Sequence, residues 1–111
     1  MTVQQLTEQL SLTVFHLDDP DRAVTGGYCG DLLSWVMAHG KQGMAWCTVQ
    51  THVNVIAVAV LMEMACVILV EGVEAEPASL KKAQDEDMPV LATGKTAYEV
   101  SVLMGLSLIH I

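Results

Sequence analysis

The chain has 111 residues, of which 52% are hydrophobic and 5% aromatic, and its 13 acidic and 5 basic residues give a formal net charge of −8. That length suits one domain with a single hydrophobic core. The scattered basic residues cannot form the positive surface that nucleic-acid binding requires, so we predict no nucleic-acid partner.

The order of apolar runs and turn signals predicts strands and helices that alternate along most of the chain. We expect a helix over residues 2–10, strands over 12–17 and 22–25, a helix over 28–39, a strand over 44–49, a helix over 52–65, a strand over 67–70, a helix over 78–87, a strand over 89–92 and a final helix from residue 96. Such alternation is typical of a mostly parallel sheet with helices on both faces. The predicted fold is a single three-layer α/β domain over residues 1–111.

Two of the predicted helices have distinct apolar patterns. In the helix over 28–39 the spacing of Leu32, Leu33, Val36 and Met37 predicts a buried stripe. Residues 53–70 are nearly all apolar and approach the length of a membrane-spanning helix. Asn54 and Glu63 interrupt that run, and its second half is β-branched, so we predict a buried helix followed by a buried strand and no membrane segment.

Three places along the chain share one pattern, in which a strand-like run ends in small or polar residues that open into a helix. These junctions lie at residues 23–28, 49–54 and 91–96. Loops at the carboxyl ends of parallel strands, where helices begin, are common binding places for small anionic ligands. We therefore predict a ligand site formed by eight residues: Thr25, Gly26, Gly27, Gln50, His52, Asn54, Thr93 and Thr96.

None of the three junctions matches a complete nucleotide-binding motif. Residues 93–96 read Thr-Gly-Lys-Thr like the end of a phosphate-binding P-loop, but Pro89 stands where the first glycine belongs. The glycines at 26, 27 and 30 do not have the spacing of a dinucleotide fingerprint. Helix capping without a ligand is the alternative for Thr25, Thr51 and Thr96, and both interpretations remain open here.

The three cysteines lack the spacing of a metal site or a redox pair. Cys47 and Cys66 lie in apolar runs and are predicted to be buried thiols, which fits a cytoplasmic protein. Cys29 is predicted to lie in the first turn of a helix, where it could act as a nucleophile with His52 as its base. This thiol-enzyme hypothesis is the alternative to a non-catalytic protein.

We predict no metal ion and no cofactor from the sequence. The histidines do not have ligand spacing with other donors, and Asp18, Asp19 and Asp21 are expected to form a solvated turn. The chain ends in an apolar run over residues 106–111. Because exposed apolar surface usually marks a contact, we expect part of it to be buried in a homodimer.

Several of these residues resemble the small stand-alone DRTGG-domain proteins. The resemblance is carried by residues 24–34, by Gln50-x-His52-x-Asn54 with the following Ala57-Val58-Ala59, and by Pro89-Val90-Leu91-x-Thr93 with Thr96-Ala97-Tyr98-Glu99. It covers nearly the whole chain. The contiguous Asp-Arg-Thr-Gly-Gly signature is absent, and residues 50–54, at the position of its charged pair in larger relatives, contain no charged pair.

The resemblance implies an α/β domain similar to the N-terminal domain of HPr kinase/phosphorylase. Related domains accompany phosphotransacetylases and nucleotide-sensing CBS modules as regulatory and dimerising units, and stand-alone members are often encoded near hydrogenase components. It therefore implies a non-catalytic regulatory domain, a homodimer with a small anionic ligand, and a hydrogenase-related protein as a further partner. A purely structural dimerisation protein is another alternative.

Overall fold

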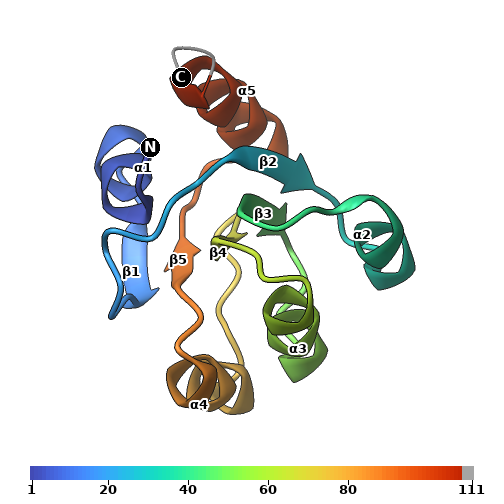
Figure 1. Ribbon diagram of the computed structural model, residues 1–111. Coiled ribbons are helices and arrows are strands. Elements are labelled where there is room, and N and C mark those ends of the chain that lie inside the picture. Colours follow the sequence, from blue (N-terminus) through green and yellow to red (C-terminus); the bar gives the residue numbers. More distant parts are fainter. Residues whose placement is uncertain (109–111) are drawn as a thin grey trace.

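The computed structural model describes residues 1–108, which form five helices and five strands (Figure 1). In chain order these are α1 (Val3–Leu10), β1 (Thr13–His16), β2 (Gly26–Cys29), α2 (Leu33–His39), β3 (Met44–Thr48), α3 (Val53–Leu61), β4 (Cys66–Leu69), α4 (Pro77–Glu86), β5 (Val90–Ala92) and α5 (Ala97–Leu108). From β2 onward strands and helices alternate, as predicted.

The five strands form one sheet in the order β1-β5-β4-β3-β2. Strands β2 to β5 are parallel, and β1 pairs antiparallel with β5. The mostly parallel α/β sheet predicted from the sequence is confirmed. The carboxyl ends of β2, β3, β4 and β5 therefore share one edge of the sheet, which we call the carboxyl edge, and their starts share the opposite amino edge.

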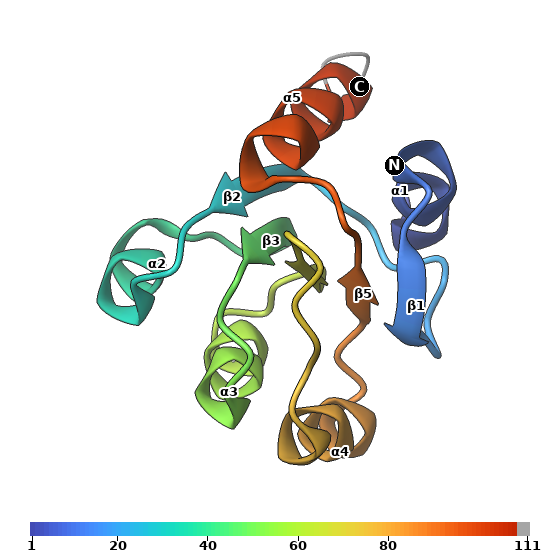
Figure 2. The same cartoon turned by 180° about the vertical axis from the view of Figure 1, so that it is seen from behind.

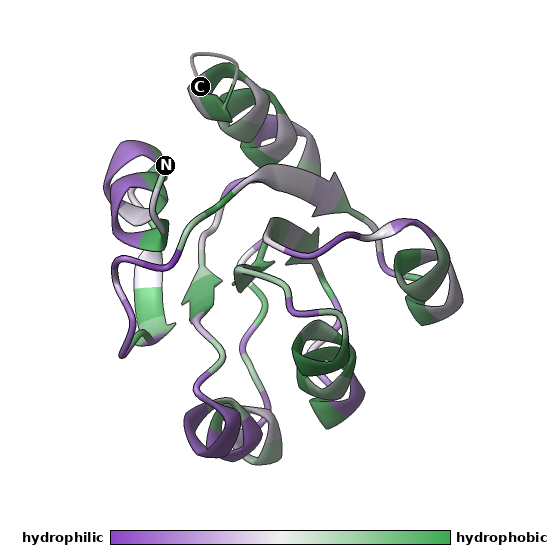
Figure 3. Ribbon diagram, in the orientation of Figure 1, coloured by the Kyte–Doolittle hydropathy of each residue, from purple (hydrophilic) through white to green (hydrophobic). Residues whose placement is uncertain are grey.

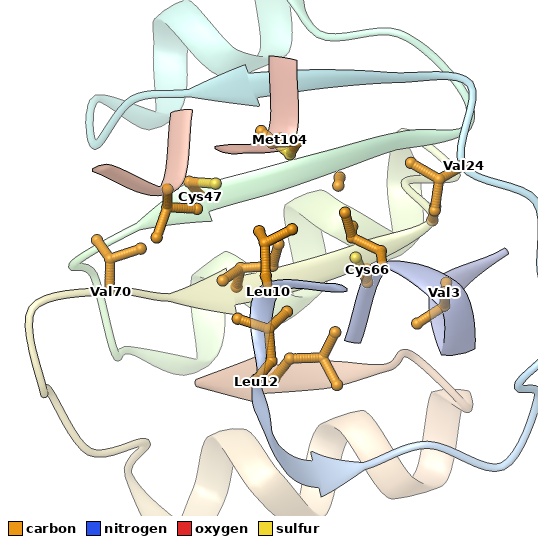
Figure 4. Close-up of a cluster of buried hydrophobic side chains, with 14 residues drawn as sticks. Val3, Leu10, Leu12, Val24, Cys47, Cys66, Val70 and Met104 are labelled. Carbon is orange, nitrogen blue, oxygen red and sulfur yellow. The ribbon is translucent and has the colours of Figure 1, made fainter. Parts of the chain in front are cut away.

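Helices cover both faces of the sheet and give the predicted three layers (Figure 2). Alternate residues along the buried strands point to opposite faces, because side chains in a strand have a period of two. Ala45, Cys47, Cys66 and Ile68 pack with α1 and α5 (Figure 4), while Trp46, Val67, Leu69 and Val90 pack with α2, α3 and α4. The mostly hydrophilic α4 contrasts with the apolar α3 beside it (Figure 3).

One stretch of the sequence prediction is wrong. Gly26 and Gly27 do not turn a strand into a helix; they belong to β2, together with Tyr28 and Cys29, and Gly26 to Cys29 pair in register with Met44 to Cys47. The helix α2 starts only at Leu33. Glycine and tyrosine in this edge strand did not resemble a buried apolar run, which is why the strand was placed too early.

The predicted buried stripe on α2 is confirmed only in part. Val36 is buried and Leu33 is half-buried against the core, but Leu32 and Met37 are 60% and 51% exposed, and Trp35 is 58% exposed. The strand next to α2 is the edge strand β2, so there is little sheet for this helix to cover. Among residues 1–108, no helix is both long and apolar enough to cross a membrane. Of the apolar tail, residues 109–111 lie outside the described part of the chain.

Candidate functional site

The carboxyl edge of the sheet brings together two of the three predicted junctions. Gln50, His52 and Asn54 follow β3, and Thr93 and Thr96 follow β5, with β4 lying between these two strands. The third junction is elsewhere: Thr25 to Gly27 begin β2 and therefore lie at the amino edge. The expectation that all three junctions share one edge is wrong, because it depended on the misplaced helix start.

At the amino edge, Thr25 connects β2 to the turn before β3. Its N–H donates to the Gly43 carbonyl at 2.9 Å, and its hydroxyl donates to the Gln42 carbonyl at 3.3 Å. Gly27 packs closely against Met104 of α5, since a Cβ built on it would lie 2.5 Å from Met104 Cε. These residues therefore have structural roles that explain their types without a ligand.

Gln50 is held by the true β2–α2 loop, whose key residue is Asp31. The Asp31 carboxylate accepts from the Thr48 hydroxyl at 2.8 Å and from the Val49 N–H at 2.9 Å. The Gln50 amide donates to the Asp31 carbonyl at 3.0 Å. This network fixes the loop after β3, and it gives Asp31 a positioning role that sequence reasoning missed, because Asp31 was assigned to a helix.

His52 and Asn54 open the helix α3. His52 is the residue before the first turn, and its Nδ1 accepts from the Asn54 N–H at 3.1 Å. Both side chains are exposed. Thr51 is tied to α4 instead, since its carbonyl accepts from the Ser79 hydroxyl at 2.6 Å. A cavity of about 10 Å³ under this loop is at most the size of one water molecule, so any ligand here must bind on the surface.

At the start of α5 the N–H groups already donate to carboxylates of the chain itself, those of Glu99 and Glu71. The Thr96 N–H and hydroxyl donate to Glu99 Oε1 at 3.2 and 3.0 Å, and the Glu99 N–H donates back to the Thr96 hydroxyl at 3.1 Å. The Ala97 N–H donates to Glu71 Oε2 at 3.4 Å. The Thr96 backbone bond, followed by its hydroxyl bond, lowers the pKa of Glu99. An incoming anion would have to displace these carboxylates, so Thr96 acts as a helix cap.

The loops after β4 and β5 are joined by backbone hydrogen bonds. The Gly72 N–H donates to the Thr93 carbonyl at 3.0 Å, and the Glu71 N–H donates to the Lys95 carbonyl at 2.8 Å. Here the helices leave the sheet toward opposite faces, α4 to one and α5 to the other, which in open α/β sheets is the usual place for a crevice. In this protein the two backbone hydrogen bonds between the loops close that crevice. The part of the carboxyl edge where α3 begins is more accessible.

The hypothesis of a Cys29–His52 catalytic pair finds no support in the arrangement of the described residues. Cys29 ends β2 and lies in a cleft with Ser101 and Met104 of α5, on one face of the sheet. His52 starts α3, which packs on the other face. The Cys29 thiolate is also not stabilised by a helix dipole, because Cys29 lies in a strand and not in the first turn of a helix.

We expect one fast-reacting thiol in the native protein. Cys29 is exposed, whereas Cys47 and Cys66 are buried; burial raises the pKa of the Cys66 thiol to about 12 and also raises the pKa of Cys47. Because the thiolate is the nucleophile, both buried thiols should be inert at neutral pH. Titration with a thiol-specific chromogenic reagent should count one thiol before denaturation and all three after it, and Cys29→Ser should remove the native count.

Neither a protein-family model nor a curated protein matches the chain. Solved structures do match it, among them the CBS and DRTGG domains of the regulatory region of Clostridium perfringens pyrophosphatase, crystallised with the activator diadenosine tetraphosphate. The TM-score is 0.72 at 12% identity, over 93% of this chain. The chain therefore shares its fold with part of that regulatory region. This chain spans 45% of the length of that regulatory region, and the predicted link to HPr kinase/phosphorylase stays a prediction.

Proposed function

We propose that this protein is a non-catalytic, cytoplasmic regulatory domain that binds a small anionic ligand, a nucleotide or phosphate-like molecule, at the carboxyl edge of its sheet. The observation that carries the proposal is the likeness of fold, at a TM-score of 0.72, to a regulatory region that binds a nucleotide activator. Ligand sites at this edge recur in open α/β sheets because several helix starts converge there.

Within that edge the start of α3 is the best candidate. His52 and Asn54 are exposed there, and the first turn of α3 holds no acidic residue. By contrast, Glu99 and Glu71 already accept from N–H groups at the start of α5. The Asn54 N–H donates to His52 Nδ1, but this neutral cap leaves the positive end of the helix without a carboxylate of its own, and therefore available to an external anion. Gln50 would flank the ligand, and Thr93, in the loop after β5 on the far side of β4, would define the far side of the site.

Binding should appear as chemical-shift changes in an NMR titration with diadenosine tetraphosphate, ATP, inorganic phosphate and acetyl phosphate. We expect the largest amide shifts at Gln50, His52 and Asn54, with smaller ones near Thr93. Shifts confined to the exposed face of α4 around Lys82, or none with any of these probes at millimolar concentration, would contradict the proposal.

An added negative charge at the start of α3 gives a sharper test. Asn54→Asp adds a carboxylate at the start of α3, where it should not destabilise the helix but should repel the ligand and weaken binding by roughly fivefold to tenfold. Gln84→Glu is the matched control, because it makes the same change at an exposed position on α4. Equal affinities of Asn54→Asp, Gln84→Glu and the wild type would exclude α3 as the binding element.

We also propose that two copies associate through the outer side of β2, as the predicted homodimer. Strand β2 pairs with β3 on one side only within the described sheet. Next to it, α2 exposes Leu32, Trp35 and Met37, and α5 exposes Val102 and Leu106. Residues 32–40 and 100–108 contain no Asp, Glu, Lys or Arg. In a chain of net charge −8, this is surface on which two copies can meet without like-charge repulsion.

Sedimentation velocity at micromolar concentrations should therefore show a dimer. Trp35→Glu should shift it to a monomer, because a carboxylate would be buried without a partner at the contact. Leu61→Glu is the control: Leu61 is 71% exposed, but it lies at the end of α3, away from β2. A wild-type monomer, or equal dissociation by both variants, would rule out this surface. Neither result would bear on the ligand site proposed at the carboxyl edge.

A further inference from the structure

A histidine and two aspartates from two segments far apart in the sequence converge at the amino edge of the sheet. His16 ends β1, Asp18 lies in the turn that follows it, and Asp87 is the residue that ends α4. His16 Nε2 lies 3.3 Å from Asp87 Oδ1 and 3.8 Å from Asp18 Oδ2. One potential ligand atom from each residue falls within 4.8 Å of the other two. The sequence pattern does not indicate this group, because Asp87 is distant from His16 and Asp18 along the chain.

An irregularity in β1 turns His16 toward this cluster. Thr13 pairs with Ala92 and Val14 with Leu91, but His16 pairs with Val90, so Phe15 is an extra residue in the strand. Without that bulge His16 would share the face of Val14, which is the face covered by α1 and α5. With it, His16 shares the face of Val90, where α4 packs. Bulges of this kind often redirect a side chain at a functional site.

We propose that His16, Asp18 and Asp87 bind a divalent transition-metal ion of the zinc type. One imidazole nitrogen and two carboxylate oxygens are a donor set that suits zinc, manganese, iron(II), cobalt or nickel, whereas magnesium and calcium prefer oxygen donors alone. Nitrogen and oxygen donors around such an ion each lie about 2.0–2.2 Å from it, so the ligand atoms must come within about 3–3.6 Å of one another. The 3.3 Å and 3.8 Å separations from His16 lie in or near this range, whereas the two carboxylates, which lie within 4.8 Å of each other, must move closer together around the ion.

The charges of the cluster also fit a divalent cation. Among residues 1–108, the only side-chain ion-pair partner of the Asp18 and Asp87 carboxylates is His16. The nearby Arg22 guanidinium instead donates to two backbone carbonyls, those of Asp87 at 3.0 Å and Met64 at 3.2 Å. With a neutral imidazole the cluster carries two negative charges, which one divalent ion balances. His16 is 9% exposed, so one ligand is already held in place by the fold.

The ion would join the turn after β1 to the end of α4. Three protein ligands leave at least one coordination position to water, as in open zinc sites. Because the ligands come from segments far apart in the sequence, metal binding should stabilise the folded chain against unfolding. This gives the proposal a readout that does not depend on any activity.

The test is a calorimetric titration of the untagged, metal-stripped chain with zinc sulfate, repeated with cobalt chloride. We expect one ion per chain and, in a thermal unfolding scan, a rise in Tm of about 10–15 °C when free metal is roughly 100-fold above Kd. Bound cobalt should give visible d–d absorption without a thiolate charge-transfer band. It should also shift or broaden the NMR signals of His16, Asp18 and Asp87 first.

Asp87→Asn is the main variant, because asparagine is accepted in the left-handed conformation that Asp87 has, with φ 53°, and should preserve the end of α4. We expect it to raise Kd by roughly tenfold or more, and His16→Gln to do the same. Asp85→Asn and His39→Gln are the matched controls and should bind like the wild type. Zinc affinity unchanged in Asp87→Asn and His16→Gln, a thiolate band from Cys29, or no binding at micromolar zinc would overturn the proposal.

Discussion

Replacement of Trp46 by alanine is expected to lower the free energy of unfolding by about 3–5 kcal/mol and to leave much of the protein unfolded near physiological temperature. Trp46 lies at the centre of β3, is fully buried, and packs in the core beneath α2, α3 and α4. Its indole N–H also donates to the Gly30 carbonyl at 2.9 Å. The substitution removes both the packing and that hydrogen bond. Urea denaturation followed by far-UV circular dichroism measures the loss.

The chain contains its own control for this substitution. Trp35 is 58% exposed and stacks on His39, with ring centroids 4.7 Å apart, so at concentrations where the chain is monomeric Trp35→Ala should cost less than about 1 kcal/mol. Trp46→Phe should fall between the two, because it keeps most of the buried volume but leaves the Gly30 carbonyl without its donor. Equal stabilities of Trp46→Ala and Trp35→Ala would contradict the burial described for β3.

Gly43→Ala is expected to lower the free energy of unfolding by about 2–4 kcal/mol, since it combines backbone strain with a steric clash. Gly43 has φ 82°, and a Cβ built on it would lie 2.4 Å from the Thr25 hydroxyl oxygen. The residue also holds three segments together: its carbonyl accepts from the Thr25 N–H, and its N–H donates to the Glu63 carbonyl. Thermal and urea unfolding should both report the loss.

A double-mutant cycle can separate the two causes. Thr25→Ala removes the hydroxyl and methyl groups that the new Cβ would meet, so Gly43→Ala should cost less in that background, and the remainder is the strain of a positive φ. Gly94→Ala is the control, because a Cβ there meets nothing within 4 Å and its φ is not positive. If Gly43→Ala lowers the free energy of unfolding equally with and without Thr25→Ala, the clash does not contribute to the loss.

The fold could be predicted from the sequence because its buried strands and helices have strong local patterns. The continuous apolar runs around Trp46, Ile68 and Leu91 predicted the central parallel strands, and their burial confirms it. Strand β2 was misplaced because an edge strand buries little, so Gly26 to Cys29 show no apolar run. The same error placed Cys29 in a helix, and Leu32 and Met37 were predicted to be buried beside it although both are exposed.

The arrangement of the candidate site was predicted only in part, for a related reason. Local pattern located Gln50, His52 and Asn54 after β3, and Thr93 and Thr96 after β5, at one edge of the sheet. It did not indicate that Glu71 and Glu99 occupy the start of α5, because Glu71 reaches Ala97 from another loop. Thr96 therefore has the capping role that the sequence left open, and the open part of the edge is the start of α3.

By itself the sequence determined the α/β class, the parallel core strands and the exposed or buried state of most cysteines, because each depends on residues close together along the chain. The tertiary structure decided everything that depends on distant residues meeting. It placed Thr25 to Gly27 at the amino edge, separated Cys29 from His52 by the sheet, and brought His16 and Asp18 to Asp87. Strand order and a one-residue bulge set these contacts, and neither is encoded in local periodicity.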